Sequence, residues 1–82
     1  MTASEVSALR ARITVDPDLC NGRPTIRGLR ITAETVLDHL SAGDTAADIL
    51  AAYPVLEPDD IRACIAFARD LLHNRLSVVA AE

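Results

Sequence analysis

The sequence contains no tryptophan and no lysine, and its aromatic residues are limited to Tyr53 and Phe67. Half of its 82 residues are hydrophobic, but these are mostly alanine, leucine, isoleucine and valine. A chain this short buries only about 60–65% of the surface that it exposes when unfolded. We therefore expect one domain with a thin core, to which a partner or a second subunit adds stability.

Long apolar runs and secretion signals are also missing. No stretch approaches the ~20 apolar residues that span a bilayer, and no charged segment followed by an apolar core and a cleavage site opens the chain. Its two cysteines, Cys20 and Cys64, are far apart and do not form the pattern of a disulfide framework. We expect a cytoplasmic protein with reduced thiols that neither spans a membrane nor is secreted.

The net charge of −4 is unevenly distributed. Residues 1–32 contain five arginines and three acidic residues, a net charge of +2. Residues 33–82 contain three arginines and nine acidic residues, a net charge of −6. The arginines of the first part suit either a phosphate-binding patch or a solvated strand edge that prevents aggregation, and the residues alone leave both alternatives open.

The first third of the chain has the pattern of a short β-ribbon. The alternation of Ile13-Thr14-Val15 predicts a strand, and a second strand is expected around Thr25-Ile26-Arg27, where Pro24 and Gly28 make the ribbon bent and edge-like. We assign residues 12–32 to this ribbon arm. Residues 1–11 are expected to be a flexible N-terminus, either a frayed helix or disordered.

From Thr32 onward the pattern becomes helical. Thr32 is placed to cap a first helix that ends before Gly43, and Thr45 with Asp48 forms a capping box for a short second helix. Pro58 is the expected first position of a third helix. That helix carries apolar residues at helical spacing, namely Ile61, Cys64, Ile65, Ala68, Leu71, Leu72 and Leu76.

These elements predict a mainly α fold with a three-helix, helix-turn-helix-like head and a short N-terminal β-ribbon arm. The single domain covers residues 12–76, with the arm at 12–32 and the head at 33–76. Residues 77–82 are expected to form a flexible tail.

Metal binding and catalysis have no convincing candidates. The histidines and cysteines lack the local spacings that zinc sites require; they are His39, His73, Cys20 and Cys64. No Walker loop, dinucleotide fingerprint or nucleophile motif is present. We therefore predict a protein that is not an enzyme and that holds no metal or cofactor.

Asp59 and Asp60 suggest the carboxylate pair of a metal-dependent nuclease. Adjacent residues on a helix point about 100° apart, however, and acids near a helix N-terminus interact favourably with the helix dipole. We therefore favour a capping role for both.

A helix-turn-helix head would present its third helix to DNA. The outward positions of that helix carry more acidic than basic residues, which is a poor match to a phosphate-lined groove. If the protein binds DNA, we expect the arm to contribute more of the affinity than the third helix. The candidate DNA-contacting residues are Arg23, Arg27 and Arg30 in the arm and Arg62 and Arg69 in the third helix.

The run from Ile13 to Thr32 resembles the opening signature of the family called domain of unknown function 433. Its most specific part is Gly22-Arg23-Pro24-x-Ile26-x-Gly28 followed by Arg30-Ile31. The resemblance continues through Tyr53-Pro54 and Pro58-Asp59-Asp60-Ile61 and covers about Arg12 to Leu72. The sequence departs from the family pattern at three positions, namely Asn21, Leu29 and Glu57.

This resemblance implies a helix-turn-helix-like bacterial protein, often considered a VapB-type antitoxin and encoded beside a PIN-like ribonuclease toxin. The expected function is thus that of an antitoxin that neutralises such a toxin and binds its own operator DNA as a homodimer in which the ribbon arm participates. Two alternatives stay open: a stand-alone helix-turn-helix DNA-binding regulator, and a structural adaptor that does not bind DNA.

Overall fold

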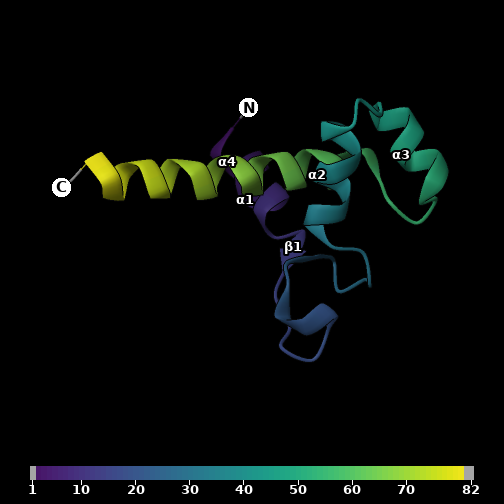
Figure 1. Ribbon diagram of the computed structural model, residues 1–82, viewed down its shortest axis with the longest axis horizontal. Helices are drawn as coiled ribbons and strands as arrows, with labels where there is room; N and C mark the ends of the chain where they lie inside the picture. The colour runs from purple at the N-terminus through teal and green to yellow at the C-terminus, as the bar shows by residue number, and fades with distance from the viewer. Residues whose placement is uncertain (1, 81–82) are drawn as a thin grey trace.

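The computed structural model describes residues 2–80, with side chains as far as Arg75. The elements in chain order are α1 (Ala3–Arg10), β1 (Ile13–Thr14), the 3-10 turn η1 (Cys20–Gly22), β2 (Thr25–Ile26), α2 (Ala33–Ser41), α3 (Ala46–Ala52) and α4 (Pro58–Ala80) (Figure 1). The predicted mainly helical fold with a small antiparallel sheet near the N-terminus is confirmed.

The longest helix, α4, runs along the 43 Å axis of the molecule, whose other extents are 31 and 29 Å. The helices α2 and α3 lie at the N-terminal end of α4, and α1 packs beside its middle. The C-terminal part of α4 extends beyond the other elements (Figure 1). The order of α2, α3 and α4 agrees with a three-helix head, while its assignment as a helix-turn-helix stays a prediction.

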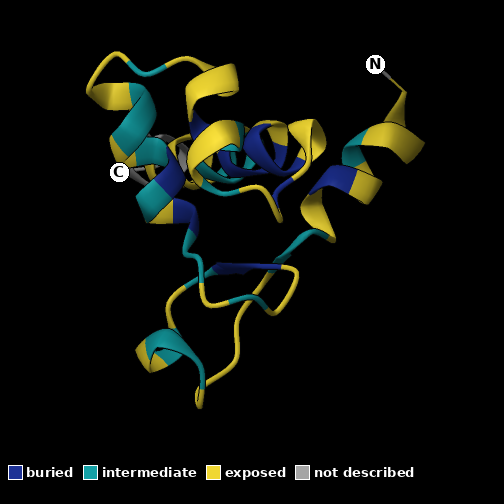
Figure 2. Cartoon of the chain, turned by 90° about the vertical axis from the view of Figure 1, so that its right-hand side faces the viewer, coloured by how far each residue is buried: buried dark blue, intermediate teal, exposed yellow. Residues whose placement is uncertain are grey.

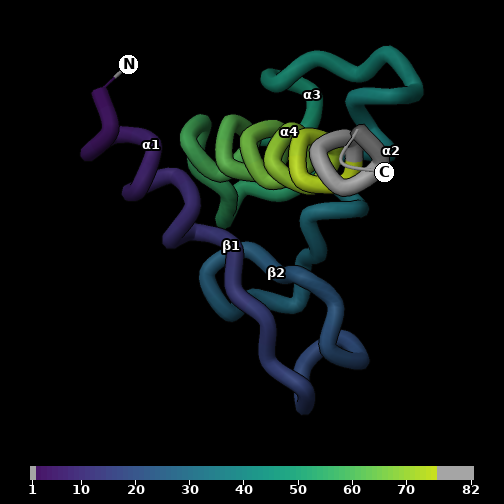
Figure 3. The backbone as a smooth tube through the Cα atoms, turned by 90° about the vertical axis from the view of Figure 1, so that its left-hand side faces the viewer, coloured from purple at the N-terminus to yellow at the C-terminus, as the bar shows by residue number. Residues whose placement is uncertain are grey.

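The ribbon is packed against the helices. Its two strands are antiparallel, with Ile13 opposite Ile26, and the N–H of Ile26 donates to the carbonyl of Ile31 at 3.0 Å, which folds the chain back toward α2. Thr25 and Ile26 have no exposed surface. Residues 15–24 form a loop that extends away from the helical body (Figures 1 and 3).

The core lies where the ribbon meets α2, α3 and the first turns of α4 (Figure 2). Its buried cluster consists of Ile26, Ala33, Val36, Ile49, Leu56, Ile61 and Cys64. Three further apolar side chains of the ribbon region, Ile13, Leu29 and Ile31, pack against this cluster, whereas Val15 is 63% exposed. The apolar surface of the ribbon is therefore largely covered within one chain, and a homodimer built on it stays a prediction.

The helix ends confirm the local signals of the sequence. The Thr32 hydroxyl accepts from the N–H of Thr35 at 3.1 Å and caps α2. Thr45 and Asp48 form a capping box, with bonds of 3.1 and 2.9 Å. Gly43, just past α2, has a φ of 97°, a value that side chains other than hydrogen disfavour.

Both ends of the chain contain more helix than expected. Residues 1–11 were expected to be flexible, as a frayed helix or disordered; residues 3–10 form α1, whose Leu9 is only 6% exposed. The expected loose tail begins at Ser77, yet α4 continues to Ala80 because no glycine or proline follows Pro58. Residues 81–82 lie outside the described residues.

Three apolar residues of α4 that the periodicity assigned to one buried stripe are exposed, namely Ile65 at 49%, Leu71 at 57% and Leu72 at 62%. None of the three belongs to the core cluster or to the side chains packed against it, since α2 and α3 cover only the N-terminal end of α4. Within residues 2–80, no helix combines the length and the apolar character needed to cross a membrane.

Candidate functional site

A polar cluster is built around the carboxylate of Asp60, whose side chain is fully buried. Arg12 donates to Oδ1 of Asp60 at 2.9 Å, and Arg27 donates through Nε to Oδ1 at 3.0 Å and through Nη2 to Oδ2 at 2.9 Å. The backbone N–H of Glu57 donates to Oδ2 at 2.8 Å. We call Arg12, Arg27, Glu57 and Asp60 the Asp60 cluster.

This geometry confirms the predicted capping role of Asp60. Asp60 is the third residue of α4, and its carboxylate accepts the N–H of the residue before the helix, Glu57, as in one half of a capping box. The Asp59 side chain is 52% exposed and pairs with Nη1 of Arg62 at 3.6 Å and with Nη2 of Arg12 at 3.9 Å. The two adjacent carboxylates thus share Arg12, but it is Asp60 that accepts the backbone N–H at the start of α4.

The opposite charges of the Asp60 cluster stabilise one another's charged forms. Burial alone would raise the pKa of Asp60, but the hydrogen bonds from Arg27, the Glu57 N–H and Arg12 outweigh it, so that the pKa is lowered. The pKa of Arg12 is raised by its hydrogen bonds to Glu57 and Asp60. Because the oxygens of Asp60 are engaged by arginine and backbone donors, this cluster fastens the ribbon to α4 and offers no open ligand position.

Arg27 also has an unusual backbone. Its φ is 50°, in the left-handed region that residues with a Cβ adopt only at a cost. Its N–H donates to the carbonyl of Arg12 at 2.7 Å and its Nη2 to the carbonyl of Val55 at 3.0 Å. Main-chain and side-chain contacts together hold this conformation in place.

The five arginines proposed from sequence as DNA contacts are not brought together. Arg27 faces inward to Asp60. Arg23 is on the surface, 2.7 Å from Glu34, and Arg30 is exposed. Arg62 and Arg69 project from α4, with side chains 65% and 66% exposed. The sequence did not indicate Arg12, because its partners Glu57 and Asp60 follow more than forty residues later.

A second polar arrangement connects α2 to the ends of α3. Nδ1 of His39 is 2.7 Å from Asp44, and Nε2 is 3.3 Å from the hydroxyl of Tyr53. Among the described residues, no group of three histidine, cysteine or acidic side chains is placed to hold a metal ion. Burial, together with the charge of Asp60, raises the pKa of the Cys64 thiol to about 11, which keeps it protonated at neutral pH.

The part of the chain with the most uniform charge is residues 33–57, which we call the acidic segment. It contains five acidic residues and neither lysine nor arginine. All five are exposed or partly exposed, namely Glu34, Asp38, Asp44, Asp48 and Glu57. This segment contains α2 and α3 and lies at one end of the molecule (Figure 1).

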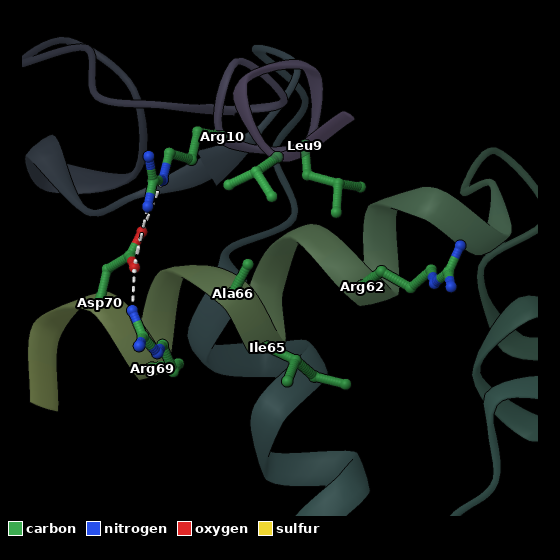
Figure 4. Close-up of a pocket in the computed structure, with 8 residues that line it drawn as sticks. Leu9, Arg10, Arg62, Ile65, Ala66, Arg69 and Asp70 are labelled. Carbon is green, nitrogen blue, oxygen red and sulfur yellow. Dashed lines mark hydrogen bonds and ion pairs between the residues drawn. The ribbon is translucent and has the colours of Figure 1, made fainter. Parts of the chain in front are cut away.

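A groove of about 460 Å³ lies between α1 and α4. Its apolar lining comes from Val6, Leu9, Ile65 and Ala66, and its polar lining from Arg10, Arg62, Arg69 and Asp70. Figure 4 shows Leu9 above α4 and two arginines, Arg10 and Arg69, directed at Asp70. This groove could not be predicted from the sequence, because one of its walls belongs to the segment expected to be flexible.

Comparison with known proteins identifies a family. The model of the family described as "Protein of unknown function (DUF433)" matches residues 13–68. A protein from Sinorhizobium fredii (strain NBRC 101917 / NGR234), described as "Uncharacterized protein y4eO", is 31% identical over 64 residues. The alignment covers 78% of this chain but only 29% of that protein. No solved structure matches the chain.

Proposed function

Because the chain belongs to the DUF433 family of proteins of unknown function, we propose that it is an antitoxin-like binding protein that neutralises a PIN-like ribonuclease toxin through its acidic segment. The observation that carries this proposal is the charge of residues 33–57, which contain five acidic residues and neither lysine nor arginine. A nuclease presents cationic side chains to its RNA substrate. An acidic surface suits such a partner, because complementary potentials speed association and exclude wrong partners.

Part of this negative charge is available for a partner. Asp38 is exposed and forms no ion pair with the other residues that the structure describes. The Glu34 carboxylate pairs with Arg23, but both side chains are at least 60% exposed. Exposed pairs of this kind are weak and exchange readily for a stronger interaction.

The residues of α3, α4 and the ribbon support operator binding less well. The helix α3 contains no basic or amide side chain, and α4 begins with acidic residues. Nε and Nη2 of Arg27 are engaged by the buried carboxylate of Asp60, which leaves only part of its guanidinium for a phosphate. Any DNA contact in the ribbon therefore falls mainly to Arg23 and Arg30, and substituting either should lower the slope of log affinity against log salt by about 0.9 on any duplex.

The test of the proposal is binding to the nuclease encoded beside this chain. The purified pair should form a complex that stops RNA cleavage. Asp38→Lys should weaken the complex about tenfold, a loss of about 1.4 kcal/mol, and added salt should weaken it further. The control is Asp18→Lys, which makes the same charge change in the exposed ribbon loop.

Three results would contradict the proposal: no nuclease gene beside this one, a nuclease that does not bind, or equal effects of the two lysine substitutions. If the chain instead binds a cognate duplex without any toxin, the stand-alone regulator is supported. If the chain binds neither the nuclease nor the duplex, the structural adaptor is supported.

A further inference from the structure

We propose that the groove between α1 and α4 binds an apolar helical segment of a partner protein that carries acidic side chains along its edges. This site is separate from the acidic segment and does not depend on the proposed function. Its walls come from α1 and from the face of α4 beside it, whereas the acidic segment lies at the N-terminal end of α4.

The shape of the apolar surface favours an elongated ligand. The groove volume of about 460 Å³ is within the range of small-molecule pockets. However, Leu72, seven residues beyond Ile65 on the same face of α4, is 62% exposed, and Ile65 itself is 49% exposed. Two helical turns separate these residues, or about 10 Å at 1.5 Å per residue. A helix that lays apolar residues at i, i+3, i+4 and i+7 along such a surface matches it.

The charge of the rim favours an acidic ligand. Three arginines line the groove, and the side chains of Arg10, Arg62 and Arg69 are 56%, 65% and 66% exposed. Two of them, Arg10 and Arg69, share the single carboxylate of Asp70. The groove is thus a cationic and apolar site on a chain whose net charge is −4. Carboxylates of a ligand would complete the contacts of these guanidinium groups.

A second copy of this chain fits the groove less well. The same face of a second copy carries Arg10, Arg62 and Arg69 against the single carboxylate of Asp70, so that two copies meeting through this face would bring surfaces of like charge together. Like charges placed opposite each other across an interface are unfavourable. The arginines therefore discriminate against self-association through this face.

The groove depends on residues outside the region that defines the family. The family match covers residues 13–68, so that Val6, Leu9 and Arg10 of α1, and Arg69 and Asp70 of α4, fall beyond it. We therefore expect the partner to be specific to chains that carry an N-terminal helix like α1.

The experiment uses the full chain and three synthetic amphipathic peptides of about 16 residues. The first has leucines at i, i+3, i+4 and i+7 flanked by glutamates. The second has lysines in place of the glutamates, and the third has serines in place of the leucines. Fluorescence anisotropy gives the affinity of each peptide, and amide chemical shifts in the NMR spectrum of the labelled protein locate the binding site.

We expect the glutamate peptide to bind at least about tenfold more tightly than either of the others, and to shift Val6, Leu9, Ile65 and Ala66. The double variant Arg62→Glu, Arg69→Glu should reverse the preference in favour of the lysine peptide. Its matched control, Arg30→Glu, introduces acidic charge at an exposed position outside the groove and should leave the preference unchanged. Asp38→Lys should not affect peptide binding, so that failure of the toxin proposal and failure of this one are distinguishable.

Several results would overturn the proposal. They are equal affinity for the glutamate and lysine peptides, shifts outside the groove, or no binding at about 1 mM peptide. Sedimentation showing a dimer whose formation Ile65→Glu abolishes would assign the groove to a second copy. Binding to vesicles of anionic phospholipid that the same variant abolishes would assign it to a lipid surface.

Discussion

Arginine has opposite roles in the two halves of this molecule. Where the ribbon meets α4, Arg12 and Arg27 direct their guanidinium groups inward to a fully buried carboxylate. On the outer face of α4, Arg62 and Arg69 project beside apolar side chains that are about half exposed. The inner half pairs its charges with a buried carboxylate, whereas the outer half holds its charges in exposed pairs with Asp59 and Asp70 and leaves apolar side chains at the surface.

The largest expected effect on stability comes from removing the Asp60 carboxylate from the inner half. Asp60→Ala should lower the free energy of unfolding by about 3 kcal/mol, because it leaves two arginines facing an apolar side chain and the Glu57 N–H without its acceptor. Urea denaturation monitored by circular dichroism measures this change. The matched control is Asp59→Ala, at a half-exposed position, which should change stability by no more than about 0.5 kcal/mol. Equal effects at the two positions would contradict the assigned role of the cluster.

Acidic pH should lower the stability that the Asp60 cluster gives to the inner half. The pKa of Asp60 is lower in the folded chain than in the unfolded one, so that the unfolded chain binds more protons in acid. The stabilisation is therefore complete above the unfolded value of about 4 and is lost as the pH falls through the folded value. The urea midpoint should decline below about pH 4, and less steeply in Asp60→Asn than in the parent chain. If the urea midpoints of both proteins depend on pH in the same way, Asp60 does not contribute to the loss of stability in acid.

Leu9 belongs to both halves, because it is the one buried residue of α1 and also lines the outer groove. Leu9→Ala should cost about 2 kcal/mol, at the low end for such a truncation because the site is at the edge of the core. Hydrogen exchange should speed up in α1 and stay slow in α2 and in the buried turns of α4. Ile65→Ala is the control from the opposite wall, with an expected loss below about 1 kcal/mol. Uniformly faster exchange would show that α1 is not a separate unit.

The smallest effect on stability is expected on the outer face of α4. Leu72→Gln should change the free energy of unfolding by no more than about 0.5 kcal/mol, since the side chain is mostly exposed. Leu56→Ala, in the core, serves as the comparison and should cost about 2–4 kcal/mol. Thermal unfolding of both variants measures the difference. A large loss at Leu72 would mean that this face is already covered in the free protein.

The sequence predicted those features that depend on neighbours a few residues away. The caps at Thr32 and Thr45, the start of α4 at Pro58 and the strand at Ile13 follow from short-range rules and occur as expected. In the same way, the capping role of Asp60 required only its distance of three residues from Glu57.

Features that depend on the distant partner of a side chain were not predictable. Periodicity places Asp60 on a helix but does not indicate that Arg27, thirty-three residues earlier, will reach it. The same limit explains α1, whose sequence offers few apolar anchors until α4 is present to receive Leu9. Periodicity also cannot reveal that Leu72 stays mostly exposed, because which part of α4 the other helices cover is a property of the whole fold.

The left-handed backbone of Arg27 has a further consequence, which concerns the fidelity of folding. Two strands of two residues each give little specification of register, and a slip by one residue would turn every side chain of β2 to the other face. In a slipped ribbon Arg27 would point away from α4, and Asp60 would be buried without its bidentate partner. We infer that the ion pair selects one register from several that the strands alone would tolerate. Asp60→Asn should therefore show more than one set of ribbon resonances in its NMR spectrum, while the parent chain shows one.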